Sequence, residues 1–416
     1  MNIFKKTFTQ FKELGPKKFL IENQIYFIIL IIFVIAFGLR IWDIGNVPGG
    51  FSDSERLTVD TIRNLKLNNL WLKDGFYNAA YIYLAFIWTK FFGLTIFSLR
   101  LLSALIGGAT VVMTYIFISE WFSRKIAIFT SLLFAISAFH ISVSRLIIPE
   151  IFLPLILLSL FITLTRAYRT KNVWLFGLAG TLAGLGLYTS AAFLLVPFLF
   201  VIAGIYFYRK NKKFLTSYRI ETLTALVAFL ALAIPYLVSF FTHQSSYLSY
   251  YGFAGSGLNI AMNLSQVFVT LFIKTPTNFF VNVGNEPLLD PLIFITSIFG
   301  LFFAIVSISR RKYFFLISWL SFFVIYASLK ANIVPADFLG LLPVIYAFSA
   351  LIIEYVLDRW FETFPLNKRI QILSIGLISI FFALSMLYNF NKYFVAYRNS
   401  EHVHQEFSAR SDIPLK

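Results

Sequence analysis

The 416-residue sequence contains no cysteine, which excludes disulfides, thiolate metal sites and cysteine nucleophiles. Charged residues are scarce at 13%, whereas hydrophobic residues make up 59% and aromatic residues 19%. Near-continuous apolar runs of about 20 residues recur along the chain, the length that a helix needs to cross a bilayer. The sequence therefore predicts an all-α, polytopic membrane protein.

Several motifs are missing from the sequence, and their absence argues against particular classes of function. The sequence has no glycine-rich phosphate loop and no nucleotide fingerprint, so a nucleotide ligand is not indicated. Its four histidines show no metal-ligand spacing. No acidic residue falls at the middle of a predicted span and no internal repeat is visible, so the signature of an ion-coupled carrier is missing.

Hydropathy predicts about eleven transmembrane helices. The segment Tyr77–Gly93 is apolar but short and broken by Asn78 and Lys90, so we expect it to lie in the interface. The predicted spans lie near residues 24–42, 98–119, 126–140, 150–166, 173–188, 191–208, 221–242, 288–308, 313–329, 336–356 and 370–389.

The net charge of +16 is explained by membrane topology, without a nucleic-acid partner. With Tyr77–Gly93 in the interface, 21 of the 35 basic residues fall on one side, in the basic N-terminal segment and the shorter loops. The first apolar run continues into a charged loop, so we expect this helix to remain attached. The positive-inside rule then predicts a multi-pass plasma-membrane protein with a cytoplasmic N-terminus and all large loops on the outer face.

The chain is expected to form one integral membrane domain over residues 1–416. Its predicted parts are a cytoplasmic basic segment (1–23), a first outer loop with interfacial helices (44–97), a helical core (98–242), a second outer loop (243–287), C-terminal helices (288–390) and an outer tail (391–416).

The first outer loop contains the charge-dense stretch "GGFSDSERLTVDTIRNL". "SDSE" fits a capping box, with Ser52 as the N-cap and Glu55 reaching back to it. At 100° per residue, Asp53, Arg56 and Asp60 share one face of the following helix. That face could look at water, as at an ordinary helix start, or into a site where chemistry occurs.

Several stretches carry a family resemblance through their order and spacing. "FSDSERLTVDTIRNLKLN" is followed by "YNAAYIYLAFIWTKFFG", "LRLLSALIGG", "HISVSRLIIPE" and "GLGLYTSAAFLLVPF". This order resembles the glycosyltransferase C superfamily, specifically the protein O-mannosyltransferases and the aminoarabinose transferase of lipid A. The resemblance covers about the first 200 residues; the remainder is similar by hydropathy and by "LLDPLIFITSIFGLF" and "LGLLPVIYAFSALI".

The resemblance implies a catalytic base at Asp53. The family commonly has Asp-Glu at this position, whereas this chain reads Asp-Ser-Glu, so Glu55 is displaced by one residue. The family often has a basic residue or histidine where this chain has Asn78, so a phosphate contact is not carried over to Asn78. The substrate-binding residues expected beside the base are Arg40, Arg56, Asp60, Arg100, Arg145, Glu150 and Lys330.

These assignments have alternatives. Arg40, Arg100, Arg145 and Lys330 could each contact a lipid phosphate or anchor a helix at the membrane interface. Glu150 could orient Arg145 or the acceptor, or begin a helix. His140 is interpreted as a packing residue. The loop 243–287 could hold sugar-stacking or lid helices, or be an ordinary interfacial segment, and "NLS" at 263–265 is a glycosylation sequon by pattern alone.

The predicted function is inverting transfer of a sugar from a polyprenyl-phosphate donor to a protein, lipid or glycan acceptor on the outer face. The phosphate leaving group needs no protonation, so the reaction requires one base and cations on the phosphate. No cofactor is expected, and a divalent cation is left open. The alternatives are a polyprenyl-linked lipid carrier or flippase without transferase chemistry, and a membrane scaffold without substrate.

Overall fold

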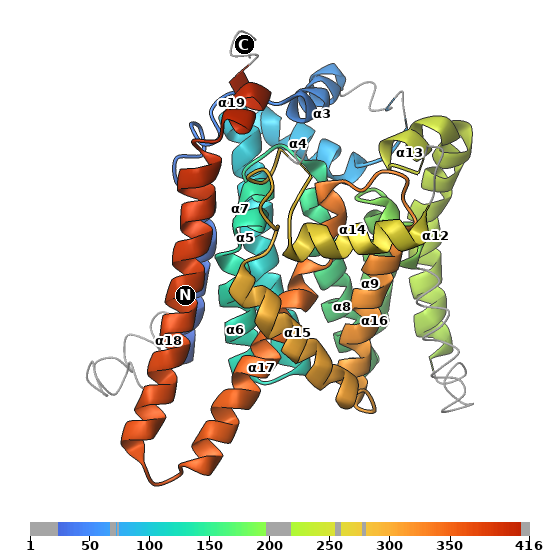
Figure 1. Ribbon diagram of the computed structural model, residues 1–416. Coiled ribbons are helices and arrows are strands. Elements are labelled where there is room, and N and C mark those ends of the chain that lie inside the picture. Colours follow the sequence, from blue (N-terminus) through green and yellow to red (C-terminus); the bar gives the residue numbers. More distant parts are fainter. Residues whose placement is uncertain are drawn as a thin grey trace, which may run out of the picture.

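The computed structural model describes residues 24–66, 72, 75–196, 218–253, 259–276 and 280–408. The basic segment 1–23, most of the predicted span 191–208 and the last residues of the tail lie outside the described residues. The described residues form a bundle of helices and contain no β-strand (Figure 1).

Ten helices of the described residues form the body of the bundle (Figure 1). They are α2 (Gln24–Ile41), α5 (Ile96–Trp121), α6 (Arg124–Ala135), α8 (Phe152–Thr170), α9 (Val173–Leu187), α12 (Arg219–Thr242), α15 (Pro291–Val306), α16 (Arg311–Ser328), α17 (Leu342–Thr363) and α18 (Lys368–Phe390).

The remaining described elements cover or connect these helices. They are α3 (Asp53–Asn64), α4 (Ala79–Phe92), α7 (Ala138–Ser144), η1 (Pro149–Ile151), η2 (Ala191–Leu194), α13 (Gln244–Tyr250), α14 (Ile260–Phe272), η3 (Pro335–Phe338), the π-helical η4 (Asn391–Tyr397) and α19 (Glu401–Ser408).

Each of ten predicted spans coincides with a longer helix, and the eleventh begins at η2. Among the described residues, four helices are long and apolar enough to cross a bilayer, or five if α6 and α7, bent by 61°, form one span. The total of eleven remains a prediction. The apolar window of α18 is only 11% buried, against 61% for α5, so α5 is central and α18 faces lipid.

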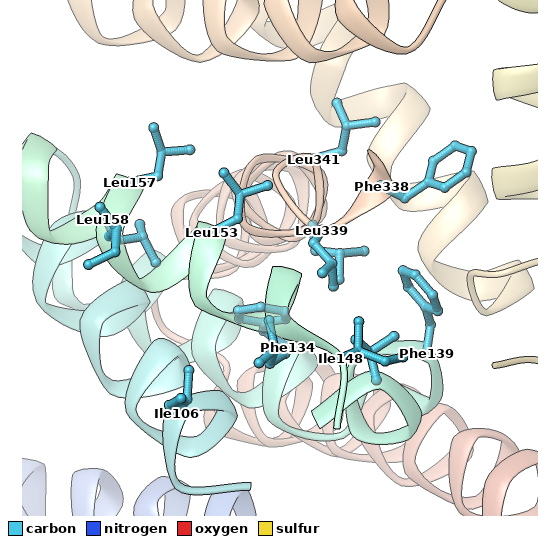
Figure 2. Close-up of a cluster of buried hydrophobic side chains, with 14 of the residues drawn as sticks. Ile106, Phe134, Phe139, Ile148, Leu153, Leu157, Leu158, Phe338, Leu339 and Leu341 are labelled. Carbon is cyan, nitrogen blue, oxygen red and sulfur yellow. The ribbon is translucent and has the colours of Figure 1, made fainter. Parts of the chain in front are cut away.

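The apolar core joins helices distant in sequence. Figure 2 shows Phe134 of α6, Phe139 of α7 and Leu153 of α8 gathered around Leu339, which follows η3. All four side chains are buried. The short helices η1 and η3 lie next to this cluster at one end of the bundle. Close packing of the cluster therefore fixes the position of these two elements and of the polar side chains that they carry.

Two helix pairs pack closely enough to require glycine. A Cβ atom on Gly180 in α9 would lie 2.0 Å from the Ala225 carbonyl oxygen of α12. A Cβ atom on Gly300 in α15 would lie 1.8 Å from the Phe348 carbonyl oxygen of α17. Small residues allow the close backbone approach that stabilises helix pairs in membranes.

The two ends of the bundle differ in character. Helices α3, α4, α13 and α19 lie at one end, called here the α3 end (Figure 1). At the opposite end, ion pairs join neighbouring helices: Lys125 of α6 contacts Asp358 of α17 at 2.8 Å, and Arg166 of α8 contacts Glu120 of α5 at 2.7 Å. These basic residues belong to the loops that the sequence analysis placed on the cytoplasmic side.

Two segments at the α3 end bear on the predicted topology. Helix α4 has 14 residues, a length of about 21 Å, which is shorter than the roughly 30 Å of a bilayer core. This length favours the interfacial interpretation of Tyr77–Gly93. The predicted outer tail is helical over residues 391–397 and 401–408, and its Val403 and Phe407 are buried against the rest of the chain.

Gly300→Ala should lower the thermal stability of the purified protein in detergent, because the added methyl group meets the α17 backbone. Overpacking of this kind costs about 1–3 kcal/mol. Gly376→Ala in α18 is the matched control, since its Cβ atom meets nothing within 4 Å. Equal unfolding midpoints for the two variants would contradict the close α15–α17 contact.

Candidate active site

Helix α3 begins with the capping box that the sequence predicts. The Ser52 hydroxyl accepts a hydrogen bond from the Glu55 backbone N–H at 3.3 Å, and the Glu55 carboxylate accepts one from the Ser52 N–H at 3.2 Å. Asp53 occupies the first helical position with an exposed side chain. The positive end of the helix dipole favours its ionised form there.

Glu55 is buried and bound on both of its oxygens. Arg100 of α5 donates from Nε to Oε1 at 2.9 Å and from Nη2 to Oε2 at 2.8 Å. The Ile147 N–H also donates to Oε1, at 3.0 Å. Both side chains of the Glu55–Arg100 ion pair have 0% exposure. Glu55 is therefore a structural anchor that fixes α3 against α5.

The Arg100 guanidinium also holds the loop before α3. It donates to the Pro48 carbonyl at 2.8 Å and to the Gly50 carbonyl at 2.9 Å. Its three nitrogens therefore all have acceptors within the protein. The loop leading to Asp53 and the helix carrying Asp53 are fixed by the same side chain.

Arg145 caps the C-terminal end of α2. Its guanidinium donates to the carbonyls of Leu39 at 3.0 Å, Trp42 at 2.6 Å and Val47 at 2.9 Å. It also lies 5.4 Å from the Tyr393 ring centroid. Carbonyls at the end of a helix lack intrahelical donors and carry partial negative charge, so they compensate the buried guanidinium.

Arg40 is held in the same way deeper in the bundle. It donates to the carbonyls of Ala36 at 2.7 Å and Ala135 at 3.0 Å, the second of these at the end of α6. Its Nη2 lies 2.7 Å from His140 Nδ1. The His140 ring packs 4.2 Å from the Phe134 ring, in the packing role expected for this histidine.

These contacts revise part of the predicted site. Arg40, Arg100 and Arg145 have 0% exposure, so none presents a donor to a lipid phosphate in this structure. The structure does not support the expectation that these arginines and Asp53 line one cavity. The reason is local: at a membrane boundary, buried guanidinium groups pair with the nearest carboxylate and helix-end carbonyls.

A second polar group, called here the Glu150 cluster, joins Asn78, Glu150 and Tyr250. Glu150 Oε1 accepts hydrogen bonds from Asn78 Nδ2 at 2.6 Å and from the Tyr250 hydroxyl at 2.9 Å. Asn78 is buried at the start of α4 in a left-handed conformation, with φ of 57°. Burial, reinforced by the Glu150 charge, raises the pKa of Tyr250 well above its ordinary value.

Lys330 forms a buried ion pair with Asp337, at 2.6 Å. The exposed fractions are 1% for Lys330 and 4% for Asp337. Burial raises the pKa of Asp337, although Lys330 opposes this change. Asn263 of the sequon donates to the Lys330 carbonyl at 2.7 Å and is buried, so in the folded protein its amide holds the lysine loop.

Helix α4 contacts both α3, which carries Glu55, and η1, which carries Glu150. Tyr81 of α4 donates to or accepts from the Ser103 hydroxyl at 2.7 Å. Burial raises the pKa of Tyr81, and the charges of Glu55 and Glu150 both add to this increase. Both carboxylates are therefore near one tyrosine side chain.

The two remaining predicted substrate-binding residues, Arg56 and Asp60, lie on the exposed face of α3. Asp60 pairs with Arg56 at 3.8 Å and with Arg63 at 3.4 Å, and all three side chains are more than 40% exposed. Among the side chains that the structure describes, no group of three or more histidine or acidic residues is placed to hold a metal ion.

Sequence reasoning missed Tyr250 and Asp337 as site residues. Tyr250 lies in the loop predicted to hold sugar-stacking helices, but many tyrosines there looked equivalent. Asp337 follows Lys330 by seven residues, at the start of the predicted span 336–356, and this spacing was the available signal for an ion pair.

The fold is similar to that of two solved transferase structures. The oligosaccharyltransferase of Archaeoglobus fulgidus, tethered to an acceptor peptide, matches with a TM-score of 0.56 at 16% identity, over 92% of this chain and 56% of its own. ArnT from Cupriavidus metallidurans, bound to undecaprenyl phosphate, matches with a TM-score of 0.57 at 11% identity, over 92% of this chain and 77% of its own.

A family match in sequence accompanies this likeness in fold. Residues 79–237 match the sequence model of the dolichyl-phosphate-mannose-protein mannosyltransferase family. This match covers less than half of the 416-residue chain. No curated protein sequence matches the chain. The chain spans little more than half the length of the archaeal enzyme, and at these identities the structural likeness establishes the fold alone.

Glu55→Gln should destabilise the protein by about 3–5 kcal/mol, because it leaves the Arg100 charge buried without its counter-ion. Asp53→Asn should change the stability by less than about 1 kcal/mol, since it alters one exposed charge at a helix end. Chemical or thermal unfolding of both variants in detergent measures the difference. Equal losses of stability in the two variants would contradict the interpretation of Glu55 as a buried anchor and Asp53 as an exposed acid.

Proposed function

We propose that this membrane protein is an inverting glycosyltransferase that moves a sugar from a polyprenyl-phosphate donor to an acceptor hydroxyl or amine. Support comes from the glycosyltransferase C fold, the mannosyltransferase family match and an exposed carboxylate on a rigidly anchored helix. The last observation carries the chemistry, because general base catalysis requires a carboxylate that substrate can reach.

In this proposal Asp53 is the base. The acceptor oxygen or nitrogen attacks the anomeric carbon as the bond from that carbon to the phosphate oxygen breaks, and the acceptor proton passes to the Asp53 carboxylate. The bonding electrons leave with the polyprenyl phosphate, which needs no proton. A single displacement inverts the anomeric centre, and no resident cofactor takes part.

Lys330 and Glu150 are proposed to receive the donor. Among the described residues, the Lys330 ammonium donates one hydrogen bond, to Asp337, and an ammonium has three donors. It can therefore offer further donors to a phosphate after a small movement. Glu150 is partly exposed in η1, just before α8, and can accept a hydrogen bond from a sugar hydroxyl. Arg56 and Asp60 lie on the same helix as Asp53 and are assigned to the acceptor side.

The three buried arginines then have a different role from the predicted one. Arg100 and Arg145 hold residues 47–50, the loop that leads into α3, and Arg40 ties α2 to α6. We assign them to positioning the base and not to direct contact with phosphate.

We further propose that the reaction occurs on the outer face of the plasma membrane. The basic loops containing Lys125 and Arg166 lie at the end opposite α3, and the positive-inside rule assigns such loops to the cytoplasm. The α3 end, with Asp53, then faces outward. A protein, lipid or cell-wall glycan would be the acceptor there.

The decisive assay is transfer of labelled sugar from a synthetic polyprenyl-phosphate donor by the purified protein. Asp53→Asn should reduce turnover by about 10²-fold or more, the usual contribution of a general base. Glu362→Gln is the matched control, because Glu362 is an exposed, ion-paired carboxylate near the C-terminal end of α17, away from Asp53. It should turn over like the wild type.

Two outcomes would contradict this proposal. Near-normal turnover by a folded Asp53→Asn variant would exclude Asp53 as the base. Movement of the lipid donor across vesicle membranes, with no transfer of sugar to any acceptor, would instead favour a carrier or flippase.

Lys330→Met should raise KM for the lipid donor by about tenfold or more, equivalent to roughly 1.4 kcal/mol of lost phosphate binding. It should also destabilise the protein, because Asp337 would be left buried and unpaired. The double variant Lys330→Met with Asp337→Asn should recover most of the stability without recovering KM. Recovery of both would indicate a purely structural lysine.

A further inference from the structure

The C-terminal segment Asn391–Ser408 packs onto the α3 end of the bundle. It consists of η4, a π-helical continuation of α18, and α19. Its Tyr393, Tyr397 and Phe407 are each 1% exposed. In Figure 1 α19 lies beside α3 at the end of the bundle where Asp53 is found. This burial needs explaining, because sequence reasoning predicted only an outer tail here.

The segment makes direct backbone contact with the loop before Asp53. The Phe407 carbonyl accepts a hydrogen bond from the Phe51 N–H at 3.2 Å. Gly50 adopts φ of +92°, and a Cβ atom there would lie 1.9 Å from the same carbonyl oxygen. The backbone of α19 therefore approaches so closely that only glycine fits at position 50.

The segment also packs on the arginines that hold this loop. The Phe407 ring lies 6.0 Å from the Arg100 guanidinium, and the Tyr393 ring lies 5.4 Å from that of Arg145. The Tyr393 hydroxyl donates to the Val47 carbonyl at 3.4 Å. Rings packed on guanidinium groups limit their motion, so the loop is held from both sides.

A third set of contacts reaches the segment 280–287. The Tyr397 hydroxyl donates to the Phe280 carbonyl at 2.9 Å, and Lys392 Nζ donates to the Pro287 carbonyl. The Phe280 and Phe407 rings meet edge to face at 6.3 Å. The C-terminal segment thus connects the loop before Asp53 to the end of the long loop between α12 and α15.

From these contacts we infer that the C-terminal segment is a positioning element of the transfer reaction, fixing the direction in which α3 presents Asp53. Asp53 is two residues from Phe51, so a shift of the loop moves the carboxylate directly. Misplacement of a catalytic group by about 1 Å can lower turnover by about 10²-fold. The inference rests on the proposed role of Asp53 as the base.

Gly50→Ala tests the inference, with Gly93→Ala as the matched control. Both glycines have positive φ, but a Cβ atom on Gly93 meets nothing within 4 Å. Gly50→Ala should separate the loop from Phe407, speed amide hydrogen exchange over residues 50–53 and lower kcat by about tenfold or more. KM for the lipid donor should not change. Gly93→Ala should leave both the exchange of residues 50–53 and kcat as in the wild type.

Phe407→Ala is the second variant if Gly50→Ala does not fold. It removes the ring from Arg100 and Phe280 while keeping the backbone of α19. Like Gly50→Ala, it should speed amide hydrogen exchange over residues 50–53 and lower kcat, but by a smaller factor.

The outcomes separate the inference from the proposed function. If Asp53→Asn retains turnover, the proposed base fails and the inference fails with it. If Asp53→Asn loses turnover but Gly50→Ala keeps the wild-type kcat, with or without faster exchange, the base stands and the positioning inference is overturned. An increase in KM as large as the loss in kcat would also overturn the inference, because it would indicate a disturbed donor site.

Discussion

The Glu55–Arg100 ion pair is the contact on which the rest of the candidate site depends. A charge pair with 0% exposure loses its hydration, and only close geometry with additional hydrogen bonds compensates for this loss. Here both carboxylate oxygens are bonded to Arg100, and further donors come from Ser52 and Ile147. The pair therefore fixes α3, α5 and the segment before η1 to one another.

This anchor explains how two acids in one short motif can differ in role. Asp53 and Glu55 are separated by two helical positions, about 200° around the axis, so they point to nearly opposite faces. Glu55 faces α5 and becomes fully buried, whereas Asp53 remains exposed. Because Glu55 is held rigidly, the position of Asp53 on the same helix is also defined. A preorganised catalytic group requires a defined position of this kind.

Local patterns predicted the elements well, but not the partners of the charges. The capping box at Ser52 and the apolar stretches of α5 and α12 depend on nearby residues, and the structure confirms them. The acceptors of Arg145 are carbonyls at the end of α2, about 100 positions away in the sequence. A carbonyl is present at every residue, so no pattern in the sequence marks the few that a guanidinium will reach. The family resemblance carried over the arginines as positions, without their partners.

The charge balance of the described site limits where a donor phosphate can bind. Arg100 is neutralised by Glu55, and Arg40 and Arg145 are surrounded by helix-end carbonyls, so these cations add little positive potential toward substrate. Lys330 is also paired, but through a single hydrogen bond to Asp337, and its ammonium keeps donors that a phosphate could use. Because Lys330 is 1% exposed, the proposed contact with a donor phosphate requires the residues around the ammonium to move. Asn263 of α14 bonds to the Lys330 carbonyl, so the lysine and the helix would move as one unit.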